Sequence, residues 1–537
     1  MPALRKHFAN WKANPRRWEI TYILRGILGN PLPLLLFCAL ASVYFSHFRM
    51  PFTPIWESND QWDVLKDPAR MWEGDRIYRD FYEQTTPGTA VVDLLFFRLF
   101  GLKNWIPNLH VILLGLGLTW LVVIVSRKIF RERPFLTLLP GFFFLTFAFF
   151  PHMQDTHRWY SCAAALAALA VVMEERTSWP LVAAGVLSGV CSFFTQTQGV
   201  FAVMGLGVFL LWDGHRRVCK GRELLWQMSC LLGAFAATVL ATDGYFIWGA
   251  GLWRFLDCVV RIPVLYLSAD PANTWHVYMS EMQRPAHWYN LPGLGRYLFI
   301  YALLPMVYIL FPVRYRHETA NGEDRVRLML LSIVGLFLFA SVALAPSYFR
   351  LCTVSPPAFV ALIYWIRGEG KFHRILAGSL WISIFYLGIV YPLRAQISPT
   401  VYLQLPRGRM AFAQQSAGDY ELMRWLSSQT RPGEFVLGTG QLYFIYPLAL
   451  RPVDETSGYE NSRATRPEWV QSAVAALERN SVRFIEWPPD TTDPSFYRPE
   501  DDHLAPLRKY VQSNYHLVRR FEDPTGNELA EIWERNE

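Results

Sequence analysis

The side chains best suited to chemistry in this sequence are the carboxylates of a polar stretch, residues 57–67, that follows the first long apolar segment. Ionisable groups beside a membrane are costly unless they face water, a partner or a substrate. A carboxylate held there can take the proton from a hydroxyl group and so act as a general base. We therefore expect the chemistry of this protein at Asp60-Gln61-Trp62-Asp63, with Asp63 near the substrate or a metal.

A second polar cluster, residues 151–159, lies between two apolar segments and contains Asp155, His157 and Arg158. Arginine binds phosphate with two parallel hydrogen bonds, and histidine donates a hydrogen bond or a proton. His157 and Arg158, together with the isolated cation Arg350 between two later apolar segments, predict a phosphate site. Instead of binding a phosphate, the charged residues of 151–159 could simply cap the ends of helices. Arg350 could extend its side chain to the lipid headgroups.

Asp60 and Asp155 could instead bind a divalent ion, Mg²⁺ or Mn²⁺, between them. Carboxylate oxygens suit both ions, and the ion would neutralise a phosphate. The sequence does not choose between the two uses. The seven cysteines have no metal-ligand spacing and none lies beyond residue 393, so neither a cysteine zinc site nor a disulfide framework is supported.

Long apolar segments separated by short basic loops must position these residues. The 537 residues are 52% hydrophobic and only 18% charged, less than the roughly 25% of a soluble domain. Because roughly 20 apolar residues cross a bilayer, we predict a multi-span α-helical membrane protein with about eleven transmembrane helices. The predicted spans are residues 30–47, 106–126, 134–150, 159–173, 180–195, 199–212, 224–248, 296–313, 326–345, 352–366 and 374–393.

Lysine and arginine predict the orientation of the bundle, because loops rich in them stay in the cytoplasm. With the N-terminus inside, the inner segments carry 22 of these residues, whereas the short outer loops carry only Arg158 and Arg350. The same rule divides residues 180–212 into two spans at the polar break 195–199. Both polar clusters and the C-terminal tail then face the outer side of the plasma (inner) membrane.

The outer loop 48–105 is too long to be a simple connection. Asp67 and Pro68 resemble a helix start, and Gly74 resembles a helix end, so we predict a short helix there. Residues 89–100 are amphipathic and predict a second helix. Both are expected to lie along the membrane surface and to hold the carboxylates near the headgroups.

In this loop the sequence resembles the GT-C superfamily, integral-membrane glycosyltransferases that use polyprenyl-phosphate sugars and include the protein O-mannosyltransferase and aminoarabinose transferase branch. The residues that carry the resemblance are Asp60, Gly74, Tyr78-Arg79-Asp80-Phe81 and Pro87-Gly88. The resemblance implies a GT-C-like fold with juxtamembrane helices and makes Asp60 the catalytic carboxylate.

The same resemblance places Asp155 at the border of the active site and Tyr78, Arg79 and Asp80 in the neighbourhood of the substrate or metal. A common form in the family is Asp-Glu, whereas this chain has Asp60-Gln61. If the site needs a second carboxylate, another part of this chain must provide it.

The composition changes near residue 394, which divides a transmembrane catalytic domain (1–393) from an extracytoplasmic α/β domain (394–537). In the second domain, predicted helices alternate with predicted strands. The helices are expected at 421–426, 469–478 and 504–514, and the strands at 434–437, 482–486, 517–521 and 530–533. No phosphate-binding loop or nucleophile motif is present, so we expect this domain to bind the acceptor or to support the loop.

These features predict a cell-envelope glycosyltransferase that moves a hexose or pentose from a polyprenyl-phosphate donor to an acceptor hydroxyl, with inversion and without a nucleotide. The acceptor can be a lipid, a glycan or a protein. The alternatives are a transporter or flippase of lipid-linked glycans and a non-catalytic envelope-assembly protein. A transporter would show internal repeats and charges at mid-span, whereas this sequence has no clear repeat and its charges gather in the predicted outer loops.

Overall fold

The computed structural model describes most of the chain. The described residues are 30–130, 133–218, 220–265, 273–282, 298, 300–301, 304, 306–308, 322–368, 370–439, 442–456, 459, 465–487, 502–522 and 528–537. The basic segment 1–29 lies outside them, and so does most of the predicted span 296–313.

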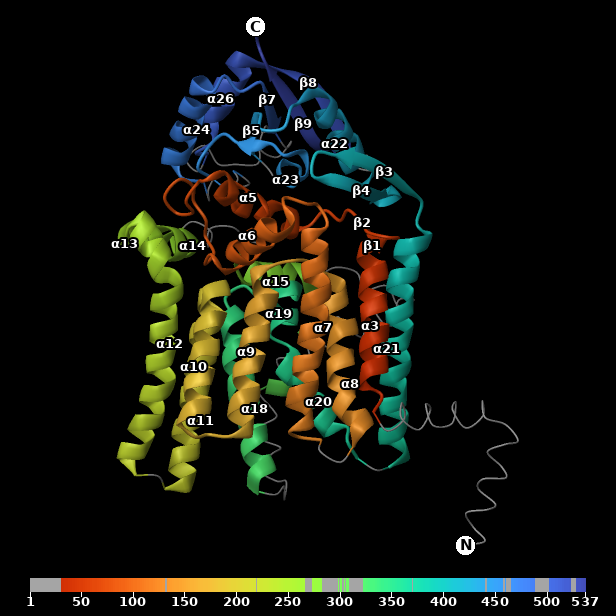
Figure 1. Cartoon of the computed structure of the whole chain (residues 1–537), viewed down its shortest axis with the longest axis vertical. Helices are drawn as coiled ribbons and strands as arrows, with labels where there is room; N and C mark the ends of the chain where they lie inside the picture. Colours follow the sequence, from red (N-terminus) through yellow and green to blue (C-terminus); the bar gives the residue numbers. More distant parts are fainter. Residues whose placement is uncertain are drawn as a thin grey trace, which may run out of the picture.

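Helices of the membrane part stand side by side in a bundle (Figure 1). Six of the described helices have the length and hydropathy to cross a membrane: α7 (Ile106–Arg127), α8 (Pro134–Phe144) continued by η1 (Leu145–Phe149) and η2 (Phe150–His152), α11 (Gln196–Arg217), α12 (Gly221–Ala250), α18 (Gly322–Val342) and α21 (Lys371–Ile397). Four shorter ones complete the described bundle: α3 (Leu32–His47), α9 (His157–Glu174), α10 (Ser178–Phe194) and α20 (Pro356–Trp365). The predicted multi-span helical fold is confirmed, and each predicted span outside 296–313 coincides with one of these helices.

The predicted break between two spans is present at Thr195, whose backbone is extended (φ −143°, ψ 103°) between α10 and α11. Gly199 explains how closely the two helices approach each other. A Cβ there would lie 2.3 Å from the backbone nitrogen of Ser192, closer than any side chain permits.

The loop 48–105, predicted to lie on the outer side, crosses one end of the bundle and contains both predicted helices (Figure 1). A short hairpin precedes them, formed by β1 (Phe48–Arg49) and β2 (Thr53–Pro54). Helix α5 (Lys66–Glu73) starts one residue before Asp67 and ends, as predicted, at Gly74, whose φ of 108° suits a glycine. Helix α6 (Gly88–Phe100) is the second, and α4 (Asp60–Val64) is an additional helix that the sequence reading missed.

The C-terminal part is the α/β unit that the sequence predicts. Its five-stranded sheet has the order β6-β5-β7-β9-β8, with β5 parallel to β6 and β7, and β9 antiparallel to β7 and β8. The strands are β5 (Phe435–Gly438), β6 (Arg451–Pro452), β7 (Phe484–Trp487), β8 (Tyr515–Glu522) and β9 (Glu528–Arg535), and the main helices are α22 (Ala417–Gln429), α24 (Pro467–Arg479) and α26 (Ala505–Asn514). A hairpin of β3 (Thr400–Leu405) and β4 (Gly408–Ala413), which the sequence reading missed, connects α21 to this unit.

Alternation along the strands divides the core of this unit into two layers, because successive side chains point to opposite faces. Val436 and Phe484 pack with α22 on one face, whereas Leu437 and Ile485 pack with α24 and α26 on the other. The first layer continues into the loop 48–105 through the buried residues Trp56, Trp62, Leu65, Ala69 and Phe97. The C-terminal unit therefore supports the loop that carries Asp60.

Trp56 joins the loop 48–105 to the C-terminal unit, and Trp56→Ala is expected to destabilise the protein. Its side chain is 1% exposed, it stacks on Trp62 with ring centroids 4.9 Å apart, and its indole N–H donates to Asp419 Oδ2 at 3.0 Å. Removing a buried tryptophan costs about 3–5 kcal/mol. We expect a fall of several degrees in the Tm measured in detergent. Trp72→Ala, at a side chain that is 44% exposed, is the control, and an equal fall there would contradict this role for Trp56.

Candidate active site

Asp60 lies at the first position of α4, on the side of the helix that faces away from the protein core. The helix is fixed by its buried residues, since Trp62 is fully buried and Gln61 is 1% exposed. Asn59 caps it by accepting a hydrogen bond from the backbone N–H of Gln61 at 3.2 Å. Asp60 itself is exposed, and no described residue donates a hydrogen bond to its carboxylate. A rigid helix start therefore presents a carboxylate that is free to accept a proton.

The charges around Asp60 are those that the sequence predicts to gather there. Desolvation by the surrounding protein raises the pKa of Asp60, the neighbouring Asp63 raises it further, and Arg158 and Arg350 lower it. Arg158 lies in the first turn of α9, and Arg350 lies in α19 (Tyr348–Thr353). Three elements far apart in the sequence thus bring one carboxylate and two guanidinium groups into electrostatic range of one another.

The two arginines differ in how they are held. Arg350 Nη1 donates to the carbonyl of Ala345 at 3.1 Å, and its Nη2 donates to Asn273 Oδ1. The Arg158 side chain makes neither a hydrogen bond nor an ion pair with any described residue. The two guanidinium groups repel each other, and Thr156, before α9, provides no side-chain cap for the first N–H groups of that helix. Two cations and an uncapped helix start favour an anion at this point.

His157 precedes Arg158 and is held by the break between α10 and α11. Its Nδ1 lies 2.8 Å from Thr195 Oγ1, and the residue is within electrostatic range of both Arg158 and Arg350. The polar break is therefore not only a helix end, because Thr195 orients a histidine at the predicted phosphate site.

Asp155, by contrast, is turned into the protein. It is 1% exposed, its Oδ2 lies 2.6 Å from His110 Nδ1, and its Oδ1 accepts a hydrogen bond from the Tyr160 hydroxyl at 2.8 Å. Its backbone N–H donates to Gln61 Oε1 at 3.3 Å, which connects it to the helix of Asp60. Both carboxylate oxygens of Asp155 therefore have partners within the protein, and an ion shared between Asp155 and Asp60 stays a prediction.

The other residues predicted near the substrate have contacts of their own. Asp63 accepts from buried Lys66 at 3.2 Å. Tyr78 is buried and donates to the carbonyl of Thr85 at 2.6 Å. Arg79 and Asp80 form an ion pair at 2.7 Å on the protein surface. These contacts shape the loop, and none of them links Tyr78, Arg79 or Asp80 to Asp60.

Two residues near the site, Asp93 and His110, were not singled out from the sequence. Asp93 lies in α6, is 1% exposed, and places its Oδ1 3.1 Å from the same His110 nitrogen that contacts Asp155. A signal was available for His110, because an ionisable residue inside a long apolar span points to a polar partner. Gln61 was noted from the sequence only for replacing a glutamate, and its contact with the backbone of Asp155, 94 residues later, has no local signal.

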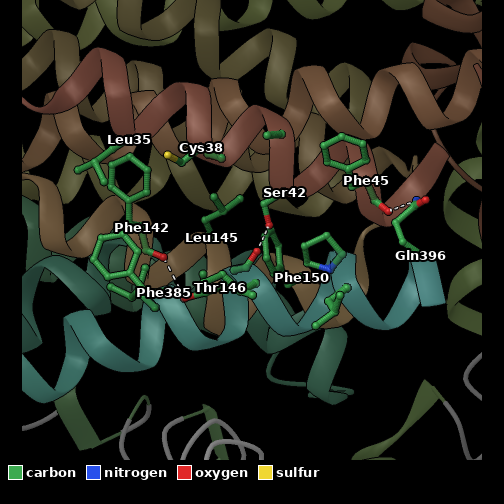
Figure 2. A pocket seen from close by; sticks show the side chains of 17 residues that line it. Leu35, Cys38, Ser42, Phe45, Phe142, Leu145, Thr146, Phe150, Phe385 and Gln396 are labelled. Carbon is green, nitrogen blue, oxygen red and sulfur yellow. Dashed lines mark hydrogen bonds between the residues drawn. The ribbon is translucent and has the colours of Figure 1, made fainter. Parts of the chain in front are cut away.

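A separate apolar groove of about 480 Å³ lies between α3, α21 and the segment from α8 to η2. Figure 2 shows that its labelled polar side chains include Ser42 and Gln396, and both are hydrogen-bonded to backbone carbonyls, Ser42 to Gly388 and Gln396 to Phe45 and Phe48. Its lining residues include no aspartate, glutamate, lysine, arginine or histidine. The groove suits a hydrocarbon chain but provides no group for the reaction.

Comparison with solved structures identifies similar folds at low sequence identity. The structure of ArnT from Cupriavidus metallidurans bound to undecaprenyl phosphate matches 93% of this chain and 97% of its own, with a TM-score of 0.58 and 13% identity. An oligosaccharyltransferase from Archaeoglobus fulgidus, tethered to an acceptor peptide, matches 94% of this chain and 74% of its own, with a TM-score of 0.52 and 11% identity. The oligosaccharyltransferase AglB from the same organism, in complex with an inhibitory peptide and a dolichol-phosphate, has a TM-score of 0.51 and 12% identity over 93% of this chain and 74% of its own. No family model matches the sequence, and no curated protein does.

Proposed function

We propose that this chain, which has the fold of the GT-C membrane glycosyltransferases, transfers one sugar from a polyprenyl-phosphate donor to an acceptor hydroxyl. The phosphate lies against Arg158, Arg350 and His157, and the acceptor hydroxyl lies against Asp60. The neighbours support the donor class, since ArnT was solved with undecaprenyl phosphate and AglB with a dolichol-phosphate.

In the reaction the acceptor oxygen attacks the anomeric carbon, and Asp60 takes the proton of the hydroxyl. The bond between that carbon and the phosphate oxygen breaks, and its electron pair leaves with the polyprenyl phosphate. The two guanidinium groups stabilise the charge that develops on the leaving phosphate. Since attack and departure occur on opposite faces of the sugar, the configuration inverts. General-base help is worth about 10²–10⁴ in rate, and fixed charge stabilisation adds a comparable factor.

The observation that carries this proposal is the pairing of a free carboxylate with a free guanidinium. Asp60 and Arg158 interact electrostatically, yet neither side chain makes a hydrogen bond with a described residue. Residues that only stabilise a fold are normally satisfied by their neighbours. A carboxylate and a guanidinium group that lie within electrostatic range of each other, and that have no hydrogen bond to a described residue, instead suit a substrate with a proton to lose and a phosphate to bind.

The purified full-length protein in detergent or nanodiscs, given a radiolabelled polyprenyl-phosphate sugar and a membrane extract as the source of acceptor, tests the proposal. Consumption of the donor with release of polyprenyl phosphate is expected. Movement of the intact labelled donor across a vesicle membrane without its cleavage would instead identify a flippase. Binding of the donor without either change would indicate a non-catalytic assembly protein.

The pH dependence of the reaction follows from the surroundings of Asp60. Only the deprotonated carboxylate acts as a base, so the rate falls as the pH drops through its pKa. Because the pKa of Asp60 is raised, mainly by desolvation, the acid limb of kcat/KM is expected above the ordinary aspartate value of about 3.9. Arg350→Met removes a charge that lowers this pKa and should move the limb to higher pH. A limb that stays in place in Arg350→Met, with Arg424→Met as the unaffected control, would contradict Asp60 as the base.

A further inference from the structure

Three buried side chains meet between the loop 48–105 and the helix bundle. They are Asp93 from α6, His110 from α7 and Asp155 from the segment before α9, and one ligand atom of each lies within 4.8 Å of the other two. Each residue is 1–2% exposed. This cluster is separate from the pairing of Asp60 with Arg158 and takes no part in the proton transfer described above.

The hydrogen bonding of the cluster leaves one carboxylate without a partner. His110 Nδ1 carries at most one hydrogen, and Asp155 Oδ2 at 2.6 Å is its close acceptor. Asp93 Oδ1 lies 3.1 Å from the same nitrogen, but neither oxygen of Asp93 forms a hydrogen bond with any described residue. Burying the carboxylate of Asp93 beside His110 without a hydrogen bond costs free energy of folding.

The charge of the cluster can be balanced by a proton on Asp93 or by an additional cation. No described lysine or arginine forms an ion pair with Asp93 or Asp155, so a protonated His110 would neutralise only one of the two carboxylates. A divalent ion bound by two carboxylates and a neutral imidazole neutralises both. Ligand atoms at about 2.0–2.1 Å from a tetrahedral metal lie about 3.3 Å apart, so the 2.6 Å and 3.1 Å separations need only small shifts.

We propose that Asp93, His110 and Asp155 bind a divalent ion of the zinc class, with the fourth position filled by water or by the Tyr160 hydroxyl. One imidazole nitrogen and two carboxylate oxygens form a donor set that zinc accepts, whereas Mg²⁺ prefers oxygen ligands alone. The Tyr160 hydroxyl is 2.8 Å from Asp155 Oδ1 and therefore adjacent.

The ion has a structural consequence for the site. It ties α6, α7 and the segment before α9 together, and the backbone N–H of Asp155 then holds Gln61, the residue beside Asp60. Asp93 and His110 are accordingly positioning residues. The proposal does not depend on the glycosyltransferase reaction, because its first readout is metal content.

The test uses the full chain in detergent, stripped with a chelator, reloaded with Zn²⁺ and analysed by mass spectrometry for metal per chain. One zinc per chain is expected in the wild type and in Asp60→Asn, and reloading should raise the Tm. Asp93→Asn and His110→Gln should bind zinc at least about 100-fold more weakly, since changes outside the ligand set alone cost 10–100-fold. Co²⁺ in the wild type should give the visible absorption of a tetrahedral site, which keeps the proposal testable if a variant fails to fold.

Two results would overturn this assignment. If the wild-type protein binds no stoichiometric zinc or cobalt, then protons and not a metal ion balance the charges of Asp93, His110 and Asp155. Loss of the ion in Asp60→Asn, with retention in Asp93→Asn, would place it between Asp60 and Asp155 instead. Neither result bears on whether the protein cleaves a polyprenyl-phosphate sugar, so the two proposals fail separately.

Discussion

Asp60→Asn is expected to lower kcat/KM for sugar transfer by about 10²–10⁴-fold, the contribution of a positioned general base. Asparagine has the same size and fits the same exposed position at the start of α4, but it cannot take the proton of the acceptor. Because no described residue depends on the Asp60 carboxylate for a hydrogen bond, the fold and the binding of the donor should be preserved. The measurement is the initial rate of donor consumption, with the Tm and donor binding recorded for the same preparation.

The matched control is Asp75→Asn in the same loop. Asp75 Oδ2 pairs with Arg70 Nε at 2.9 Å on a partly exposed side chain, so its loss should change the rate by less than about threefold. An Asp60→Asn protein with wild-type turnover would show that the base lies elsewhere. An equal loss in both variants would indicate damage to the loop rather than removal of a base.

The helices of the membrane part were predictable because each carries its own signal. Hydropathy and the lysine and arginine count are local properties, and they identify the spans and the break at Thr195 without any tertiary contact. Helix α5 ends where Gly74 predicts, since a left-handed backbone favours glycine. The hairpin of β3 and β4 was missed because its inner face packs on the outer loop. Ile55 and Trp56 contact β4 across more than 350 residues of sequence, and no local pattern reveals such a contact.

The candidate site was predictable in its charges but not in the direction of one side chain. Asp60, His157, Arg158 and Arg350 were selected as polar residues in outer loops, and all outer loops meet at one end of a bundle. Asp155 satisfies the same rule, yet its side chain is buried and contacts His110. The direction of the Asp155 side chain depends on its partner, His110. His110 lies inside an apolar span 45 residues earlier, so no pattern near Asp155 reveals it.

Arg158→Met is expected to lower kcat/KM for the polyprenyl-phosphate sugar by about 10²–10³-fold, the loss seen when one preorganised donor to a developing negative charge is removed. Arg158 is the cation at the site whose side chain makes no hydrogen bond with a described residue, so its N–H groups are available to a phosphate. Arg350 is already held by Ala345 and Asn273, and its replacement should cost less. The measurement is the rate of donor cleavage, together with inhibition by polyprenyl phosphate, the predicted product.

The conservative variant separates charge from geometry. Arg158→Lys keeps the positive charge but loses the planar pair of N–H donors that matches a phosphate, so it should recover only part of the activity lost in Arg158→Met. Arg424→Met is the control, because Arg424 is exposed in the C-terminal unit and pairs with Glu421. If polyprenyl phosphate inhibits Arg158→Met as strongly as the wild type, the phosphate does not bind at Arg158. The Arg158 guanidinium group would then need another anion as its partner, and the donor would have to enter the site in a different orientation.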